Sequence, residues 1–543
     1  MSAARKDLAL AGMMGAGKTV VGQALSRFLG RPFVDLDELI VQHEKKSIPE
    51  LFAKGEAVFR HAERAAVLRW LERPPKAAPE VLALGGGTLE NGEVAEAIAR
   101  RAVLVHLDAP ADVLFARLHR DEVAARPLLA GAPDPARRLA ELREKRAAGY
   151  ARADIAVPSD RYDAEGTAVA VLRVLYQPGR GPWRETARPL APRLAVAQGI
   201  VIGRGALELP EARCAALLLD SGIPDVHKDL LLPLLRERAG GRLGELERPG
   251  GEDAKSVESL AEAWAELLIA GADKDTPLWV MGGGTLTDLG GLVAHTYKRG
   301  LPLQLAPTTL LAQLDAALGG KNGINFAGSK NVVGTIRLPE GVNIDPLFLL
   351  TLRDDDLREG LTEAVKASLV GDPELLDHIE SSGPALRERS LPALEDLVAR
   401  AALTKLEVVE RDLEEAGQRR VLNLGHTLGH ALEAATRERE RPLPHGESVA
   451  IGMVFALRLA RRAGVLEDLS LLERVPAALE GLGIATRWPG LSPREREFFE
   501  IALGRDKKRS GGETVWVLPQ AAGRVVWRTL PTEDVEAALR DFA

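Results

Sequence analysis

Cysteine is almost absent from this sequence of 543 residues, in which Cys214 stands alone. One cysteine cannot form an internal disulfide or a thiolate metal cluster within a chain, so a disulfide-rich secreted domain is excluded. An excess of basic charge is also missing, because 71 Lys and Arg face 78 Asp and Glu. The composition therefore favours a protein of the reducing cytoplasm that does not bind nucleic acid.

Long apolar runs are missing as well, since glycine, proline or charged residues interrupt every candidate before the ~20 residues that cross a bilayer. Arg5 and Lys6, followed by the apolar segment 8–17, superficially resemble a signal peptide, but Lys18 interrupts the pattern. We therefore expect no membrane partner and a cytoplasmic location.

The length predicts three or four folding units at about 150 residues each. Apolar strand candidates at 8–11, 81–84 and 103–107 alternate with helical segments, which predicts a parallel α/β domain over 1–175. A segment rich in Pro, Gly and Arg predicts a linker over 176–193. Further strand candidates at 215–219 and 278–281 predict a second α/β domain over 194–345, and the composition of 346–543 predicts a mostly helical domain.

Residues 12–19 read Gly-Met-Met-Gly-Ala-Gly-Lys-Thr and fit the P-loop pattern between a predicted strand and a predicted helix. Backbone N–H groups of such a loop surround phosphates, the Lys reaches the terminal phosphates, and the Thr hydroxyl binds Mg²⁺. The alternative is a glycine-rich turn without a nucleotide. The predicted ATP-binding residues are Gly12, Gly15, Ala16, Gly17, Lys18 and Thr19.

Five further motifs follow in order: Asp35-Leu36-Asp37, Phe59-Arg60 before Glu63, Gly85-Gly86-Gly87, Arg126-Pro127-Leu128-Leu129, and Arg146 before Tyr150. With the P-loop they make residues 7–175 resemble shikimate kinase, which transfers a phosphoryl group from ATP to the 3-hydroxyl of shikimate. The resemblance implies a fold of the P-loop NTPase type, with shikimate and ATP as partners.

The resemblance also implies the roles of single residues. Asp37 holds substrate hydroxyls, Arg60 and Arg146 bind the substrate carboxylate, and Gly86 and Gly87 lie against the ring, in keeping with guanidinium–carboxylate pairing.

Two further roles concern the nucleotide. Asp35 supports Mg²⁺ with Thr19, and Arg126 lies in a lid over ATP, where its charge stabilises the transferring group. The implied catalytic set is Lys18, Asp37 and Arg126, and the residue that stacks on adenine remains open.

A second glycine run, Gly282-Gly283-Gly284, follows a strand candidate and precedes Asp288. Such a run lets a dinucleotide diphosphate approach the backbone, although its spacing does not match GxGxxG and a structural turn remains open. A polar series downstream suits a phosphorylated, carboxylated sugar. It comprises Arg299, Thr308, Thr309, Asp315, Lys321, Lys330 and Asn331.

Three of the ten histidines, His426, His430 and His445, lie close together in the sequence. His426 and His430 are four positions apart and so share one helix face. A helical histidine pair can equally belong to a core or a surface, whereas two imidazoles with a carboxylate can bind Zn²⁺. Glu363, three residues before Lys366, offers such a carboxylate.

With these motifs, the chain from about residue 194 to the C-terminus resembles 3-dehydroquinate synthase. The resemblance implies a Rossmann-like NAD-binding domain before the helical domain. It implies that Glu363, His426 and His445 bind Zn²⁺, although Co²⁺ suits the same ligands, and that His430 supports a ligand or relays a proton. The implied catalytic residues are Lys321, Lys366 and His430.

The implied NAD⁺ contacts are Asp220, Glu252, Lys255, Gly282, Gly283, Gly284, Asp288, Thr308, Thr309, Lys321 and Lys330. The implied contacts of the cyclase substrate are Arg299, Asp315, Lys321, Asn331, Lys366, Lys405, Arg419, Asn423, His430 and Lys507.

The implied reaction cyclises 3-deoxy-arabino-heptulosonate 7-phosphate to 3-dehydroquinate with release of phosphate, and NAD⁺ is regenerated. Thr287, Asn322, Ala367 and Ser368 depart from the family's pattern. Related sugar-phosphate cyclases that make deoxy-inosose or valiolone rings are therefore the alternative. Zinc-dependent glycerol dehydrogenases are a more distant alternative than these cyclases, because their reaction gives no role to the phosphate-binding series.

We thus expect a bifunctional enzyme of aromatic amino-acid biosynthesis that dimerises through its synthase half. In one alternative, one half is a non-catalytic binding or oligomerisation module. In another, a P-loop regulatory switch is fused to a dehydrogenase. Because the two inferred steps are not consecutive, each half should be active on its own.

Overall fold

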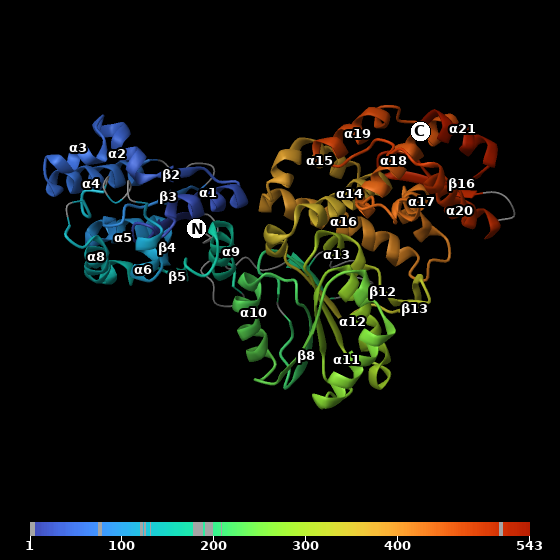
Figure 1. Ribbon diagram of the computed structural model, residues 1–543, viewed down its shortest axis with the longest axis horizontal. Coiled ribbons are helices and arrows are strands. Elements are labelled where there is room, and N and C mark those ends of the chain that lie inside the picture. Colours follow the sequence, from blue (N-terminus) through green and yellow to red (C-terminus); the bar gives the residue numbers. More distant parts are fainter. Residues whose placement is uncertain are drawn as a thin grey trace. The chain divides into compact units, whose positions relative to one another are not determined.

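The computed structural model describes residues 6–73, 79–119, 123, 126–130, 132–177, 188–189, 199–207, 209–509 and 514–542, with backbone alone at 188–189 and 505–509. The chain divides into two compact units (Figure 1). Unit 1 comprises Met1–Thr186 and Pro224–Leu231, and unit 2 comprises Ala187–Ile223 and Leu232–Ala543. Among the described residues, no helix is long and apolar enough to cross a membrane.

Unit 1 contains a sheet of five parallel strands in the order β2-β3-β1-β4-β5. The strands are β1 (Asp7–Ala11), β2 (Phe33–Asp35), β3 (Val81–Ala83), β4 (Ala102–Asp108) and β5 (Ile155–Pro158). The central strand β1 is buried along its whole length, as expected for a parallel strand covered on both faces. The three strands predicted in this part of the sequence are confirmed.

The helices of unit 1 follow their strands along the chain, so that the parallel strands are joined by helical crossovers. They are α1 (Lys18–Leu29), α2 (Leu36–Glu44), α3 (Ile48–Ala53), α4 (Glu56–Glu72), α5 (Gly92–Arg101), α6 (Ala111–Ala116), α8 (Pro135–Tyr150) and α9 (Ala164–Leu175). Helix α1 buries Val21, Leu25 and Phe28 at helical spacing and ends at Gly30, which adopts the left-handed conformation.

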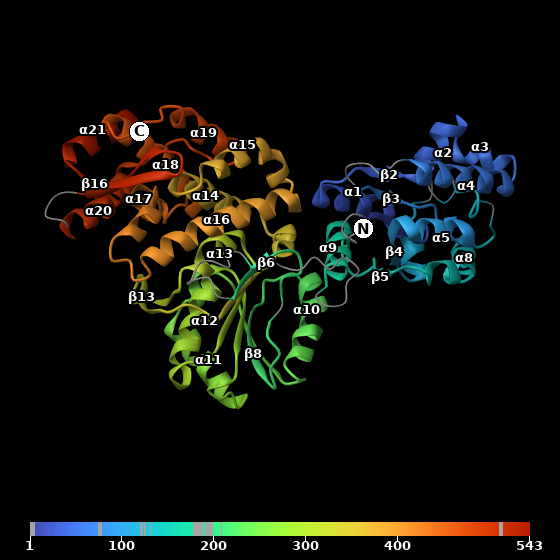
Figure 2. The same cartoon turned by 180° about the vertical axis from the view of Figure 1, so that it is seen from behind.

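Unit 2 has a sheet in the order β6-β7-β14-β11-β10-β8-β9, parallel except for the edge strand β6 (Figure 2). The strands are β6 (Arg188–Pro189), β7 (Ile200–Ile202), β8 (Ala215–Asp220), β9 (Leu243–Arg248), β10 (Leu278–Gly282), β11 (Leu303–Pro307) and β14 (Gly341–Ile344). The strand order reverses at β8, because β9 lies on one side of it and β10 on the other. Ligands of open α/β sheets bind at such a reversal, outside the carboxyl ends of the strands.

The helices after residue 224 are α10 (Asp225–Arg238), α11 (Val257–Ile269), α12 (Gly284–Thr296), α13 (Leu310–Leu314), α14 (Asp354–Val370), α15 (Pro373–Arg387), α16 (Leu391–Arg411), α17 (His426–Thr436), α18 (His445–Arg462), α19 (Leu471–Gly481), α20 (Pro493–Arg509) and α21 (Thr532–Phe542). Short 3-10 helices include η4 (Glu252–Ala254), η5 (Tyr297–Arg299) and η8 (Gln418–Asn423). One apolar core runs from the α/β part of unit 2 into the helical part. The α/β parts and the mostly helical C-terminal part agree with the predicted fold class.

Two antiparallel hairpins are additions to that prediction. One pairs β12 (Lys321–Phe326) with β13 (Ser329–Ile336), and the other pairs β15 (Thr514–Ala521) with β16 (Arg524–Leu530). The second hairpin interrupts the region predicted as helical, and Trp516 on β15 packs edge-on against Phe455 of α18. Most of the predicted linker lies outside the described residues, and Arg188–Pro189 within it form β6.

Two candidate active sites

The P-loop of unit 1 connects the central strand β1 to α1 at the carboxyl edge of the sheet. Gly15 and Gly17 have φ of 82° and 86°, and a Cβ on Gly15 would lie 2.6 Å from the Leu114 carbonyl oxygen, so the loop requires glycine there. Lys18 Nζ donates to the carbonyl oxygens of Gly12 and Met13 at 2.9 and 3.1 Å. Burial lowers the pKa of Lys18 to about 8, against the attraction of Asp37. Ala16 is buried in the same loop.

The two aspartates of the second motif lie beside the P-loop, because β2 ends at the same edge as β1. Asp35 accepts a hydrogen bond from Thr19 Oγ1 at 3.1 Å, and its second oxygen accepts from the Asp37 backbone N–H at 2.9 Å. Burial and the charge of Asp35 raise the pKa of Asp37, while Lys18 and Arg126 oppose that shift. The structure thus brings the predicted Mg²⁺ pair, Thr19 and Asp35, next to Asp37, Lys18 and Arg126.

The predicted carboxylate-binding residues meet over the glycine run that follows β3. A Cβ on Gly86 would lie 3.2 Å from an Arg146 nitrogen, and one on Gly87 would lie 2.4 Å from an Arg60 nitrogen. Glu90 joins the two arginines, since Arg146 Nε donates to it at 2.8 Å and Arg60 Nη2 lies 3.7 Å away. Although burial raises the pKa of Glu90, its cationic partners lower it overall.

Three further side chains, those of Glu63, Glu90 and Arg117, belong to this site, although the sequence motifs assigned them no role. Glu63 is buried and accepts from Arg60 at 2.8 Å and from Thr88 Oγ1 at 2.7 Å. Glu90 could not be inferred from spacing, because its arginine partners come from α4 and α8. Arg117, one of the basic residues before Arg126, donates to the Ser159 carbonyl at 2.6 Å and lies 3.5 Å from the Gly15 carbonyl. The neighbouring residues 120–122 lie outside the described part of the chain.

In unit 2 the predicted dinucleotide residues gather where the strand order reverses, at the ends of β8 and β10. A Cβ on Gly282 would lie 3.3 Å from Asp220 Cβ, and one on Gly283 would lie 3.0 Å from Thr309 Cγ2. The Thr308 N–H donates to the Gly282 carbonyl at 3.0 Å. Gly284 begins α12, so the glycine run, both threonines and Asp220 lie together beside a helix N-terminus.

A second polar group surrounds Lys255 and includes Asp288 of the same helix α12. Lys255, which is buried, donates to Asp288 at 2.7 Å and also contacts the side-chain oxygen of Asn331. Glu252 accepts from Asn325 at 2.8 Å. Burial raises the pKa of Asp288 to about 6 despite the neighbouring Lys255, and the charges of Glu252 and Asp315 add to the rise.

Asp315 lies at the centre of a buried charged cluster that includes Lys405, Lys366 and Glu363. It contacts the Lys405 ammonium and accepts from Lys366 Nζ at 3.4 Å, and Lys366 also pairs with Glu363 on the same helix. Burial alone would raise the pKa of Asp315, but the two ammonium groups lower it overall. Helix α14 is buried almost all round, so Glu363 and Lys366 lie inside the protein.

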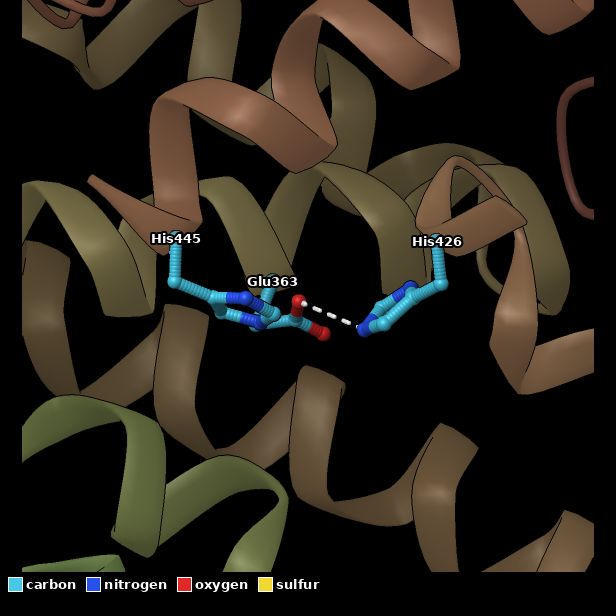
Figure 3. A group of neighbouring side chains, drawn as sticks. All are labelled: Glu363, His426 and His445. Atoms are coloured by element: carbon cyan, nitrogen blue, oxygen red, sulfur yellow. Dashed lines mark ion pairs between the residues drawn. The ribbon is translucent and has the colours of Figure 1, made fainter. Parts of the chain in front are cut away.

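The candidate metal ligands Glu363, His426 and His445 place one ligand atom each within 4.8 Å of one another (Figure 3). His426 Nε2 lies 3.7 Å from Glu363 Oε1, and that oxygen is buried with no hydrogen-bond donor among the described residues. Burial and the Lys366 charge lower the pKa of His426 well below its usual value. A buried carboxylate oxygen facing a neutral imidazole fits Zn²⁺ or Co²⁺.

Glycines let α17 and α18 approach closely enough to bring the two histidines together. A Cβ on Gly452 would lie 2.0 Å from the Gly425 carbonyl oxygen, and Gly425 itself has φ of 81°. A Cβ on Gly429 would lie 3.2 Å from the Ser448 backbone. His426 and His445 are the first residues of the two helices, so this crossing sets their separation.

The remaining predicted residues of unit 2 are dispersed around this centre. Lys321 pairs with Glu415 at 2.5 Å, and the buried Arg419 donates to the carbonyls of Gly319 and Leu413 at 2.8 and 2.9 Å. The His430 ring lies 5.3 Å from that of His426. Lys321 and His430 are exposed, and so are Arg299 on η5, Lys330 on β13 and Asn423 on η8. Lys507 belongs to α20, and its side chain lies outside the described ones.

Glu433 is a neighbour of this centre that the sequence reading missed. Its Oε2 lies 3.2 Å from His445 Nδ1. Burial would raise the pKa of Glu433, but the contact with His445 lowers it overall. The sequence spacing could have identified Glu433, because a residue seven positions after His426 on a helix lies on the same face as His426 and His430.

Three family models match the chain: shikimate kinase over residues 14–175, 3-dehydroquinate synthase N-terminal over 245–359, and 3-dehydroquinate synthase C-terminal over 360–509. A bifunctional shikimate kinase/3-dehydroquinate synthase of Thermotoga maritima is 34% identical over 465 residues, covering 84% of this chain and 85% of that protein. A 3-dehydroquinate synthase of Symbiobacterium thermophilum is 38% identical over 335 residues, covering 61% and 92%.

Two solved structures resemble unit 2. The 2-epi-5-epi-valiolone synthase ValA of Streptomyces hygroscopicus, with NAD⁺ and Zn²⁺ bound, is 30% identical with a TM-score of 0.55, and the match covers 66% of this chain and 95% of that one. A 2-deoxy-scyllo-inosose synthase complexed with carbaglucose-6-phosphate, NAD⁺ and Co²⁺ is 23% identical, also with a TM-score of 0.55, and covers 64% and 96%. At that identity the second structure shows the shared fold alone.

Proposed function

Because the chain belongs to the bifunctional shikimate kinase/3-dehydroquinate synthase family, we propose that it performs both reactions of that name. Unit 1 phosphorylates shikimate with ATP and Mg²⁺. Unit 2 cyclises 3-deoxy-arabino-heptulosonate 7-phosphate to 3-dehydroquinate with NAD⁺ and Zn²⁺ or Co²⁺. The observation that carries the proposal is the Thermotoga relative, whose similarity spans both units, and the charged side chains that gather in each unit support it.

In unit 1, the bound nucleotide and Mg²⁺ supply the phosphoryl group and a cation that neutralises it. Arg60 and Arg146 bind the substrate carboxylate, and Glu63 and Glu90 hold their guanidinium groups in place. Asp37 orients the ring hydroxyl and accepts its proton, and its raised pKa makes it a stronger proton acceptor than an ordinary aspartate. Lys18 and Arg126 supply positive charge beside Asp37, where the transferring group passes.

The sequence left open which residue of unit 1 contacts the adenine base of ATP. Arg117 is a basic residue beside the P-loop: it donates to the Ser159 carbonyl, just after β5, and lies 3.5 Å from the Gly15 carbonyl of the P-loop. We assign it the contact with the adenine ring, since a guanidinium plane stacks well on an aromatic face.

When bound in unit 2, NAD⁺ would supply a hydride acceptor and donor, and a metal ion held by Glu363, His426 and His445 would polarise the hydroxyl that is oxidised. Asp220, the glycine run and the Asp288–Lys255 pair hold the cofactor at the strand reversal. Lys366, Lys405 and Asp315 bind the sugar hydroxyls from the side of the metal ligands. The remaining proposed contacts with the substrate's carboxylate and phosphate are those of Lys321, Arg419, Asn331, Arg299, Asn423 and Lys507.

Three of the four positions that depart from the family's pattern, all except Ala367, donate side-chain hydrogen bonds to backbone carbonyls of the protein itself. Thr287 Oγ1 donates to the Gly284 carbonyl at 2.9 Å, and Ser368 Oγ donates to the Val365 carbonyl at 2.7 Å. Asn322 Nδ2 donates to the carbonyls of Gly320 and Arg337 at 2.9 and 3.0 Å. These contacts favour 3-dehydroquinate synthase over the related sugar-phosphate cyclases, because the departures need not alter the substrate contacts.

We further propose domains at 1–175, 194–345 and 346–543 joined by the linker 176–193, a cytoplasmic location, and a homodimer formed through the synthase half. Sedimentation equilibrium of the full chain and of a chain lacking residues 1–175 tests the dimer. Both should sediment as dimers, and loss of dimerisation in the shorter chain would place the contact in unit 1.

The purified full-length chain provides the test of function. With heptulosonate 7-phosphate, NAD⁺ and Zn²⁺ it should release phosphate and dehydroquinate in equal amounts, and with ATP, Mg²⁺ and shikimate it should release ADP only when shikimate is present. If the metal site fills but no phosphate is released, a panel of other sugar phosphates tests the related cyclases. ADP release without shikimate would instead support a regulatory switch.

A further inference from the structure

His445 lies between two carboxylates. One is Glu363, with which it forms the candidate metal group, and the other is Glu433, whose Oε2 is 3.2 Å from His445 Nδ1. The contact joins α17 to α18, at the crossing that sets the separation of the histidines. An imidazole whose Nδ1–H is held by a carboxylate has only Nε2 left for a metal ion.

His426 shows the same arrangement with a different acceptor. Its Nδ1 lies 3.2 Å from the Leu424 carbonyl oxygen, and its Nε2 faces Glu363 Oε1 at 3.7 Å. In both imidazoles, therefore, Nδ1 contacts an oxygen atom that does not belong to the candidate metal group. Histidines that bind metals almost always donate their second ring N–H to such an acceptor, which fixes the tautomer and the ring orientation.

We propose that Glu433 is a positioning residue for the metal: it holds Nδ1–H of His445 so that Nε2 points at the ion. The inference rests on the proposed metal-dependent function of unit 2, but assigns Glu433 a role outside the ligand set. Loss of such a partner typically weakens metal affinity about 10- to 100-fold.

The same residues suggest one alternative. His430, Glu433 and His445 also place ligand atoms within 4.8 Å of one another. A second ion there would require His445 to bind a metal through each nitrogen and so to lose both ring protons. Glu433 is also surrounded by cationic or ionisable neighbours, since Lys330 and His430 act on it electrostatically. The geometry thus favours one ion with Glu433 behind its histidine ligand.

The test compares Glu433→Ala and Glu433→Gln in the full-length chain by competition for Zn²⁺ with a chromogenic chelator. Glu433→Ala should weaken Zn²⁺ binding about 10- to 100-fold. Glu433→Gln keeps an oxygen that accepts from Nδ1–H and should lose less than about tenfold. Glu447→Gln is the matched control, because it removes a half-buried carboxylate two residues from His445 and should leave the affinity unchanged.

A spectroscopic readout separates positioning from a general structural role. In ¹⁵N-histidine-labelled, Zn²⁺-loaded protein, the Nδ1–H of His445 should give a slowly exchanging signal that disappears in Glu433→Ala. Wild-type affinity in Glu433→Ala, or two Zn²⁺ ions per chain that both vanish in it, would overturn the inference. A wild-type chain that binds no Zn²⁺ would refute the metal-dependent function itself, and the two failures are therefore distinguishable.

Discussion

At the scale of single residues, Asp288 gives a pH dependence whose sign follows from its environment. Burial raises its pKa to about 6, so the carboxylate that pairs with Lys255 becomes protonated as the pH falls through 6. If Asp288 binds NAD⁺ as a carboxylate, the affinity should fall about tenfold for each pH unit below 6. Fluorescence titration of NAD⁺ between pH 5 and 8 measures this, and in Asp288→Asn the break near pH 6 should be absent.

Asp315 provides a second test at this scale, on stability. Removing it by Asp315→Ala leaves the buried Lys405 without its anionic partner and Lys366 with Glu363 alone. Leaving a buried charge uncompensated costs about 3–5 kcal/mol, so the calorimetric transition of unit 2 should move to lower temperature. Asp354→Ala, which removes an exposed carboxylate paired with Arg389, should cost less than about 1 kcal/mol.

The sequence predicted the site roles of residues that belong to contiguous motifs. It did not predict the roles of residues whose partners come from distant elements. Lys18, Thr19 and Asp35 were identified because the P-loop and the paired aspartates are local patterns. Glu90 and Glu415 gained their partners, Arg146 and Lys321, only when the chain folded. Glu433 lies between these cases, since its helical spacing was readable but its partner His445 belongs to the next helix.

At the scale of elements, the crossing of α17 and α18 makes Gly452 a sensitive position. The Cβ of Gly452→Ala would lie 2.0 Å from the Gly425 carbonyl oxygen, so the helices must move apart and separate His426 from His445. We expect a loss of about 1–3 kcal/mol in stability and weaker Zn²⁺ binding in chelator competition. Gly481→Ala, with open space around its Cβ, should change stability by less than about 1 kcal/mol.

Five strands of the two large sheets, β1, β3, β4, β8 and β10, could be predicted because each is a short apolar run that is buried along nearly its whole length. Strands such as β2, β5 and β9 were not predicted, because they are partly exposed or polar. The two hairpins were missed for different reasons. Strand β13 is mostly exposed and begins with polar residues, so it lacks the pattern of a half-buried strand. Strand β15 does bury Trp516 and Leu518 on one face, but the helical composition around it obscured that alternation.

At the scale of the whole molecule, the two units each possess their own buried core and their own charged site. We therefore expect that a substitution in the site of one unit of the full-length chain removes the activity of that unit and leaves the activity of the other unchanged. Lys18→Ala should lower shikimate phosphorylation by at least about 100-fold and leave dehydroquinate formation unchanged, and Glu363→Ala should do the reverse. Paired assays of the same preparations measure both, and a variant that loses both activities while staying folded would show coupling.

Within the buried charged cluster around Asp315, the charges sum to zero without any metal. Lys366 and Lys405 balance Glu363 and Asp315, and Lys366 already contacts Glu363, so an ion can depart without stranding a buried anion. Dialysis against a chelator should therefore abolish dehydroquinate formation while the thermal transition of unit 2 persists, and added Zn²⁺ or Co²⁺ should restore turnover. In a cell, output of this half would then follow the supply of metal, whereas the amount of folded enzyme would not.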